Sequence, residues 1–130
     1  MQTFLPYRDF EDSAKVLDNK RLGKQRVEAM QILNCIYKKS GWKNHPVVKM
    51  WTGYEEALKM YHDIMIIEWK KRGFKNTMKL LSNDYITMPW WLGNPEFHLS
   101  HQSNLIRKLP DHYCKFFPKV SNNLPYFWPS

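Results

Sequence analysis

The chain has 130 residues, the size of one domain with a single hydrophobic core. A composition of 43% hydrophobic and 25% charged residues excludes a disordered chain, and no apolar run is long enough to span a membrane. The first seven residues lack the basic and apolar regions of a secretory signal. We therefore expect one domain over residues 1–130, intracellular, in the cytoplasm and independent of membranes.

The first part of the chain is predicted to be irregular and then helical. The segment up to about Asp12 has mixed residue types, and its terminus is ordered only if it docks on the rest of the protein. Ser13 to about Lys39 predicts the first helix, with Asp12 or Ser13 as its N-cap. Gly23 lies inside this helix, where a glycine lets another backbone come close, either DNA or the N-terminal segment. The polar face of the helix comprises Arg21, Lys24, Gln25, Glu28 and Gln31.

The second predicted helix carries the strongest apolar period of the chain. It runs from Pro46 to about Arg72, with Asn44 or His45 at its N-terminal cap. Gly73 follows three cations and suits the left-handed conformation at a helix C-terminus. Large apolar residues keep helical spacing along one face: Trp51, Tyr54, Leu58, Tyr61, Met65 and Trp69.

The last third of the chain is less regular. Met78 to Leu81 suggests a short helix, and residues 88–93 (Met-Pro-Trp-Trp-Leu-Gly) suggest a rigid aromatic loop. Ser100 is the expected cap of a third helix from His101 to Lys108, and the aromatic tail that follows is expected to pack over the helices. No segment alternates like a strand. The predicted fold is all-α, a compact single-domain bundle of three main helices with an irregular N-terminal segment and an aromatic-rich C-terminal tail.

Charge and aromatic content are both high. The formal net charge is +8, and 15% of the residues are aromatic, including six tryptophans. A basic surface attracts polyanions, and aromatic side chains stack on exposed nucleic-acid bases. A solvated basic surface over an aromatic core has the same composition. Composition alone therefore leaves nucleic-acid binding and this plainer interpretation both open.

The residue pattern offers no metal or cofactor site. The five histidines include no ligand set of a known kind, and His98-x-x-His101 lacks a cysteine or carboxylate nearby. Cys35 and Cys114 match no metal spacing, and we expect both to be reduced, buried thiols. There is also no phosphate-binding glycine loop and no nucleophile elbow. We expect the protein to need no cofactor.

Two polar clusters remain as candidate sites. Glu28 lies one turn past Lys24 and two turns past Arg21, which fits either a reactive carboxylate among cations or an ordinary surface ion pair. In residues 100–108, short polar side chains precede a cationic end, a pattern that suits phosphate contacts through Ser103, Arg107 and Lys108. A capped helix with a cationic C-terminus has the same pattern.

Several stretches resemble one family. Residues 67–76 (Ile-Glu-Trp-Lys-Lys-Arg-Gly-Phe-Lys-Asn) resemble the end of the long second helix of phage endonuclease V, the pyrimidine-dimer DNA glycosylase, and residues 44–48 resemble the start of that helix. Residues 21–28 (Arg-Leu-Gly-Lys-Gln-Arg-Val-Glu) fall where the family carries His-Leu-x-x-Glu-Tyr-Arg-Glu. Residues 113–117 are similar to its aromatic and basic C-terminal run. Residues 1–7 are similar to a bacterial and viral branch of the family.

The resemblance implies a fold, a reaction and two catalytic groups. The family is a compact bundle of three helices whose N-terminal α-amine attacks C1′ of the damaged nucleotide and releases the base. The resulting imine permits strand cleavage by β-elimination. Carried over by position, the essential glutamate is Glu28. The amine belongs to an unformylated Met1, because the large side chain of Gln2 disfavours removal of the initiator methionine.

An α-amine suits this reaction because its pKa is about 8, against about 10.4 for lysine, so more of it is an unprotonated nucleophile at neutral pH. The implied protein is a monomeric DNA repair glycosylase with AP-lyase activity on double-stranded DNA with a damaged base or abasic site. The residues expected to contact DNA are Arg21, Lys24, Gln25, Arg26, His45, Ser103, Arg107, Lys108 and Lys115.

Two departures from the family motif leave the lesion open. Val27 replaces an arginine of the motif, and Arg21 replaces its histidine. These changes keep the chemistry possible but leave two alternatives. One is a glycosylase for a modified base that is not a product of ultraviolet light. The other is a non-catalytic nucleic-acid-binding protein on the same scaffold.

Overall fold

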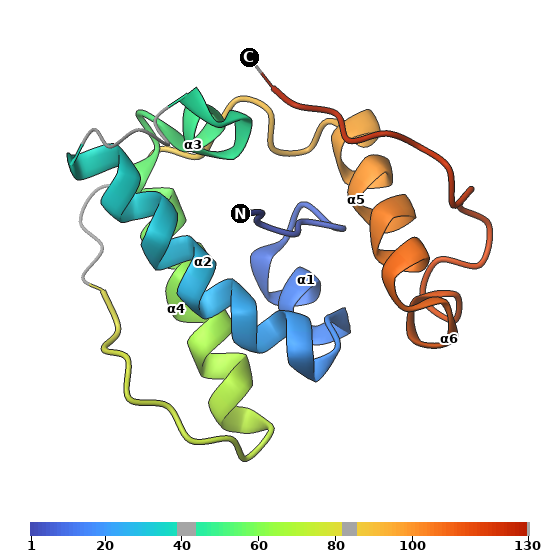
Figure 1. The fold of residues 1–130 in the computed structure, drawn as a ribbon, viewed down its shortest axis with the longest axis horizontal. Helices are drawn as coiled ribbons and strands as arrows, with labels where there is room; N and C mark the ends of the chain where they lie inside the picture. The colour runs from blue at the N-terminus through green and yellow to red at the C-terminus, as the bar shows by residue number, and fades with distance from the viewer. Residues whose placement is uncertain (39–43, 82–85, 130) are drawn as a thin grey trace.

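The computed structural model describes residues 1–38, 44–81 and 86–129, and in these residues the fold is helical without strands. The described helices are α1 (Phe10–Val16), α2 (Asn19–Lys38), α3 (Pro46–Trp51), α4 (Glu55–Lys71), α5 (Pro95–Lys108) and α6 (Pro110–Tyr113) (Figure 1). The predicted all-α fold is confirmed. Every helix in these ranges is too short or too polar to cross a lipid bilayer.

The first predicted helix is two helices, and its predicted cap is wrong. Asp9 caps α1, since its carboxylate accepts the N–H groups of Glu11 (2.7 Å) and Asp12 (3.1 Å). Leu17 then takes an extended conformation (φ −68°, ψ 137°) that turns its side chain into the core, where it is fully buried. The chain restarts as α2 at Asn19. The predicted end of this helix, at Lys39, lies outside the described residues.

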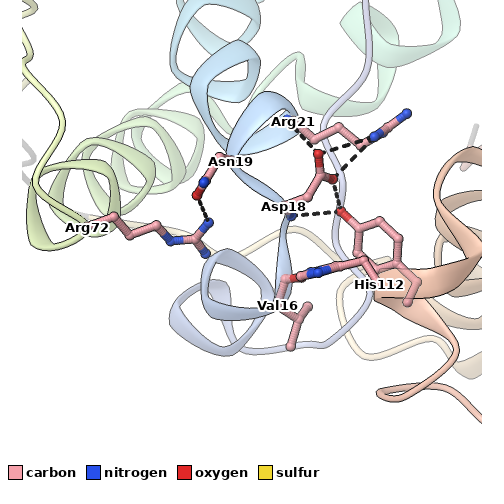
Figure 2. A network of polar contacts seen from close by, with 7 residues as sticks. Val16, Asp18, Asn19, Arg21, Arg72 and His112 are labelled. Carbon is pink, nitrogen blue, oxygen red and sulfur yellow. Dashed lines mark hydrogen bonds and ion pairs between the residues drawn. The ribbon is translucent and has the colours of Figure 1, made fainter.

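A polar network fixes the break between α1 and α2 (Figure 2). The Asp18 carboxylate accepts hydrogen bonds from the hydroxyl of Tyr113 and from Arg21 (3.3 Å). Burial opposes the ionisation of Asp18, but these two partners outweigh it and lower the pKa of the carboxyl. Arg72, at the end of α4, donates to Asn19 (3.0 Å) on the other side of the break. The break is therefore tied both to α4 and to α6.

The second predicted helix is also interrupted. His45 is the N-cap of α3, as predicted, and its Nδ1 accepts the N–H of Val47 (3.2 Å). The helix stops at Thr52, and Gly53 follows with φ of 91°, a left-handed conformation that favours glycine. α4 begins two residues later. The apolar spacing continues across this break, which is why the pattern predicted one helix.

The third predicted helix begins earlier than expected. Asn94 caps α5, and its side chain accepts the N–H of Glu96 (3.0 Å). The predicted cap, Ser100, is buried inside the helix, where its hydroxyl donates to the carbonyl of Phe97 (2.7 Å). The short helix predicted over Met78–Leu81 is absent, because residues 74–81 have no regular secondary structure.

Helices α2 and α4 lie side by side and in opposite directions (Figure 1). Gly23 makes their close approach possible, because a Cβ at this position would lie 2.9 Å from Cη2 of Trp69 on α4. The expectation that Gly23 admits DNA or the N-terminal backbone is therefore wrong. The glycine makes room for a tryptophan side chain.

The N-terminal segment lies between the α2–α4 pair and α5 (Figure 1). Hydrogen bonds from side chains hold this segment, which pairs with no strand in the described residues. His101 accepts the N–H of Leu5 at Nδ1 (2.9 Å), and His98 donates from Nδ1 to the carbonyl of the same residue (2.8 Å). The indole N–H of Trp51 donates to the hydroxyl of Thr3 (3.0 Å). The chain terminus is thereby docked on the core.

The C-terminal tail runs back along α5 (Figure 1). The Arg107 guanidinium donates to the carbonyls of Asn122 (2.6 Å) and Leu124 (3.0 Å), and the Ser103 hydroxyl accepts the N–H of Leu124 (3.0 Å). Phe127 is tied to α5 through its N–H. The tail therefore packs over the helices, as the sequence predicts.

Candidate active site

A pocket of about 280 Å³ lies where the N-terminal segment meets α2. Helix α2 presents a polar face to it, the docked terminus forms a second wall, and one residue from the end of α5 and one from the C-terminal tail complete it. The lining residues are Met1, Gln2, Phe4, Lys20, Arg21, Lys24, Gln25, Glu28, Lys108 and Tyr126. Both predicted catalytic residues, Met1 and Glu28, are among them.

The Glu28 carboxylate is the acidic group of this pocket. It is half-buried, and burial raises its pKa. The positive charges of the Met1 amine, Lys24 and Lys108 act in the opposite direction, without cancelling the effect of burial. The ion pairs of the described residues join Glu28 neither to Lys24 nor to the amine. Glu28 is therefore a weaker acid than usual that shares a pocket with Met1 and is not half of a surface ion pair.

The rim of the pocket is basic. Lys20, Lys24 and Lys108 are exposed around it, and Arg21 is half-buried beside Asp18 (3.3 Å). A second hollow of about 430 Å³ continues along α2 and shares Lys20, Lys24 and Glu28 with the first. The sequence prediction missed Lys20. The signal was available, because Lys20 lies one turn before Lys24 on the same helix.

Gln25 and Ser103 are buried, which argues against their predicted contact with DNA. The oxygen of Gln25 accepts the N–H of Phe4 (2.8 Å) and the hydroxyl of Tyr61 (2.6 Å), and its amide nitrogen donates to Glu28 Oε2 (2.8 Å). The hydroxyl of Ser103 is bonded to the C-terminal tail. Both side chains face the interior of the protein.

Two arginines that the sequence predicts to contact DNA, Arg26 and Arg107, are bound to groups of the protein itself. The guanidinium of Arg26 lies over the Trp69 ring, 4.4 Å from its centroid, and donates to Asn76 Oδ1 (2.6 Å). Arg107 holds the tail, as described above. Helix α2 thus turns Arg26 towards α4 and away from the pocket, which argues against a phosphate contact at this position.

His45 and Lys115 do not line the pocket. His45 caps α3 and forms a T-shaped pair with Trp128, with ring centroids 6.3 Å apart. Burial lowers its pKa, and the positive charge of the Met1 amine adds to this effect, so His45 lies within electrostatic reach of the terminus. Lys115 is exposed just after α6, with its ammonium 5.8 Å from the Phe116 ring.

The cysteines and histidines provide no reactive cluster. Cys35 is buried, as predicted, but Cys114, directly after α6, is exposed, so the prediction of a buried thiol is wrong at Cys114. His98 and His101 both bond to the peptide groups of Leu5. Within residues 1–38, 44–81 and 86–129, no three histidine, cysteine or acidic side chains come together in a way that could hold a metal ion.

The fold and the pocket define a small basic helical protein in which the N-terminal residue and a carboxylate line one pocket. The family model of pyrimidine dimer DNA glycosylase matches residues 1–82, which include the docked terminus, α2 and both candidate catalytic residues. The chain therefore belongs to the pyrimidine dimer DNA glycosylase family, a class of DNA repair enzyme. Searches of curated proteins and of solved structures give no significant match.

Proposed function

We propose that this protein is a DNA repair glycosylase with AP-lyase activity, in which the Met1 amine is the nucleophile and Glu28 moves protons. The observation that carries the proposal is that Met1 and Glu28 line one pocket on the basic face of α2. The proposed substrate is double-stranded DNA with a damaged pyrimidine or an abasic site.

The reaction has two stages. In the first, the amine nitrogen attacks C1′, the bond from C1′ to the base breaks, and the base leaves with a proton. Opening of the sugar ring then gives an imine between Met1 and C1′. In the second stage a base removes a proton from C2′, the C3′–O bond breaks, and the strand is cut. The chain supplies both the nucleophile and the proton carrier.

Glu28 suits the proton transfers. A group that accepts a proton in one step and donates it in the next works best when its pKa is near the working pH. Burial moves the pKa of Glu28 upward, in that direction. When ionised, the carboxylate also stabilises the positive charge that develops on the sugar.

The basic rim suits the DNA backbone. Lys20, Lys24 and Lys108 stand around the pocket and can neutralise phosphates on either side of the lesion. Moving a nucleotide out of the duplex costs a few kcal/mol, and less when the base is already damaged. Phosphate contacts at the rim offset part of that cost and hold the sugar near the amine.

Borohydride trapping on DNA with an abasic site tests the proposal. The wild-type protein should give a covalent adduct, and mapping the reduced cross-link should place it on Met1. Blocking the α-amine, or the substitution Glu28→Gln, should lower trapping by at least about a hundredfold and leave salt-dependent DNA binding intact. Glu96→Gln is the matched control, because Glu96 is an exposed glutamate at the start of α5.

The opposite results are equally informative. A wild-type protein that binds DNA but gives no adduct would be the non-catalytic nucleic-acid-binding protein. If the amine-blocked protein or Glu28→Gln reacts at the normal rate, the assignment of the two residues is wrong. A panel of duplexes with ultraviolet dimers and with modified bases then identifies the lesion that is excised.

A further inference from the structure

Gln25 is a buried amide beside the proposed catalytic carboxylate. It lies on α2, one turn before Glu28, with 1% of its surface exposed. Its oxygen accepts the N–H of Phe4 (2.8 Å) and the hydroxyl of Tyr61 (2.6 Å). Its nitrogen donates to Glu28 Oε2 (2.8 Å). One side chain therefore contacts the docked N-terminal segment, helix α4 and the proposed catalytic carboxylate.

The chemistry of these partners fixes the orientation of the amide. A backbone N–H only donates, so the atom of Gln25 that faces Phe4 is the oxygen. The amide NH₂ group therefore faces Glu28, and an NH₂ group only donates, which matches an ionised carboxylate. Reversing the amide would set its NH₂ group against the N–H of Phe4 and its oxygen against the carboxylate of Glu28, in a buried place where unsatisfied polar groups are costly.

We propose that Gln25 is a positioning residue that couples docking of the N-terminal segment to the orientation of the Glu28 carboxylate. The inference rests on the proposed function for the reaction itself, although the coupling can be measured without it. While Phe4 is docked, its N–H holds the oxygen of Gln25, and the amide NH₂ in turn holds Oε2 of Glu28. The carboxylate is thereby aligned only when the amine is also in place.

Two side chains, Gln25 and Tyr61, hold the peptide groups of Phe4 in place. Tyr61 is fully buried, and its hydroxyl lies 2.9 Å from the carbonyl oxygen of Phe4 as well as 2.6 Å from Gln25. The next residue, Leu5, is held at both its N–H and its carbonyl by two histidines of α5. Met1 lies three residues before Phe4, so the position of the amine depends on these hydrogen bonds at Phe4 and Leu5.

The electrostatics of Glu28 agree with this role. The hydrogen bond from Gln25 lowers the pKa of the carboxyl and works against burial, which raises it. The other charged or titratable groups that act on Glu28 are the Met1 amine, Lys24, Lys108, Tyr61 and Tyr126. Removing the amide removes a stabilising partner of the ionised form, so the carboxyl should then titrate at higher pH.

Three substitutions separate the two hydrogen bonds of the coupling, the one between Gln25 and Phe4 and the one between Gln25 and Glu28. Gln25→Met keeps the side-chain volume and removes both hydrogen bonds. Gln25→Glu keeps an acceptor for Phe4 but places a second carboxyl against Glu28. Tyr61→Phe keeps Gln25 and fills the same space, and it removes only the hydroxyl. Asn34→Asp is the charge control, because Asn34 is exposed on the same helix.

Three measurements apply to each variant: carbon NMR titration of labelled glutamate for Glu28, hydrogen exchange at the Phe4 amide, and the pH profile of single-turnover borohydride trapping. For Gln25→Met we expect an alkaline shift of the Glu28 titration, faster exchange at Phe4 and trapping slowed about a hundredfold, the effect of a misplaced group. DNA binding should stay unchanged. Gln25→Glu should give the largest alkaline shift of the acid limb of the trapping pH profile. It should also retain the protection of the Phe4 amide from hydrogen exchange.

Tyr61→Phe should speed exchange at Phe4 and slow trapping, and it carries the test if Gln25→Met does not fold. The inference is overturned if the folded Gln25 and Tyr61 variants match the wild-type protein in Glu28 titration and Phe4 exchange. If the wild-type protein also gives no adduct in the trapping experiment, while the titration and the exchange respond as expected, then the proposed function is wrong. In that case the titration and exchange data still decide whether Gln25 couples the terminus to Glu28.

Discussion

The imidazole of His101 is fully buried, and its Nδ1 accepts the N–H of Leu5 (2.9 Å). Burial, with a smaller effect from His98, lowers the pKa of His101 from 6.5 to about 3. In the folded protein the ring is therefore neutral over most of the acid range. In the unfolded chain it takes up a proton below about pH 6.5. Protonation also removes the lone pair that holds the N-terminal segment.

This difference predicts a loss of stability in acid. Between about pH 6.5 and pH 3 the unfolded chain binds more protons at His101 than the folded protein does, so the free energy of unfolding falls as the pH falls. The contribution of His101 should reach about 2 kcal/mol between about pH 6.5 and pH 5. Urea unfolding at a series of pH values measures it. His101→Asn, whose side-chain oxygen can replace the Nδ1 acceptor, should lose that part of the pH dependence.

Other groups also titrate in this range, so the comparison of the two proteins decides the matter. The pKa of Asp18 is lowered, which adds to the loss of stability in acid, and the pKa of Glu28 is raised, which acts in the opposite direction. Both groups are present in the wild-type protein and in His101→Asn. An identical pH slope in the two proteins would exclude His101 as the source.

At the scale of elements, the contact between α2 and α4 depends on Gly23. The Trp69 ring lies directly beside Gly23 and is held by contacts with three other residues. Phe74 stacks on the ring (centroids 4.2 Å apart), the Arg26 guanidinium lies over it, and the indole N–H donates to the carbonyl of Lys75 (2.9 Å). The ring therefore has little freedom to move away from a new methyl group.

Gly23→Ala should consequently destabilise the protein. Alanine gains about 1 kcal/mol from helix propensity, but its Cβ would lie 2.9 Å from Trp69. Overpacking of this kind costs about 1–3 kcal/mol, so the net effect should be a loss of up to about 2 kcal/mol. Denaturant unfolding measures this change. The double substitution Gly23→Ala with Trp69→Leu should show a favourable interaction energy, and strict additivity would contradict the proposed clash.

The elements show which features local sequence can predict. The cap at His45 and the end of α4 before Gly73 depend on neighbouring residues, and both were predicted. The breaks near Leu17 and Gly53 were not predicted, because the apolar spacing continues through them and tertiary packing decides where the chain turns. Helical spacing marks Glu28 only as a candidate, either a reactive carboxylate or half of an ion pair, and its catalytic role comes from the family resemblance.

The partners of Gln25 could not be found from spacing. Phe4 lies 21 residues away from it in the chain, and Tyr61 lies 36 residues away. On α2 alone, Gln25 belongs to the polar face, and only the docked terminus makes that part of the face interior. Arg107 is a comparable case, because the returning tail occupies a guanidinium that the helix alone would leave to solvent.

For the whole molecule, the distribution of charge predicts how DNA binding depends on salt. The formal net charge is +8, but only some of the cations, Lys20, Lys24 and Lys108 among them, lie at the pocket rim. Each lysine that neutralises a phosphate contributes about 0.9 to the slope of log affinity against log salt concentration. Lys24→Gln and Lys108→Gln should therefore each reduce the slope by about 1.

Two further variants make this prediction decisive. Lys59 is paired with Glu56 (2.9 Å) on α4 and does not line the pocket, so Lys59→Gln should leave the slope unchanged. Arg26→Gln should lower the free energy of unfolding, through the lost contact with Trp69, and also leave the slope unchanged. Fluorescence anisotropy with a labelled duplex across a range of salt concentrations measures all four variants. A slope reduced by Arg26→Gln and not by Lys24→Gln would place the DNA on the α4 side of α2, away from the Met1 amine.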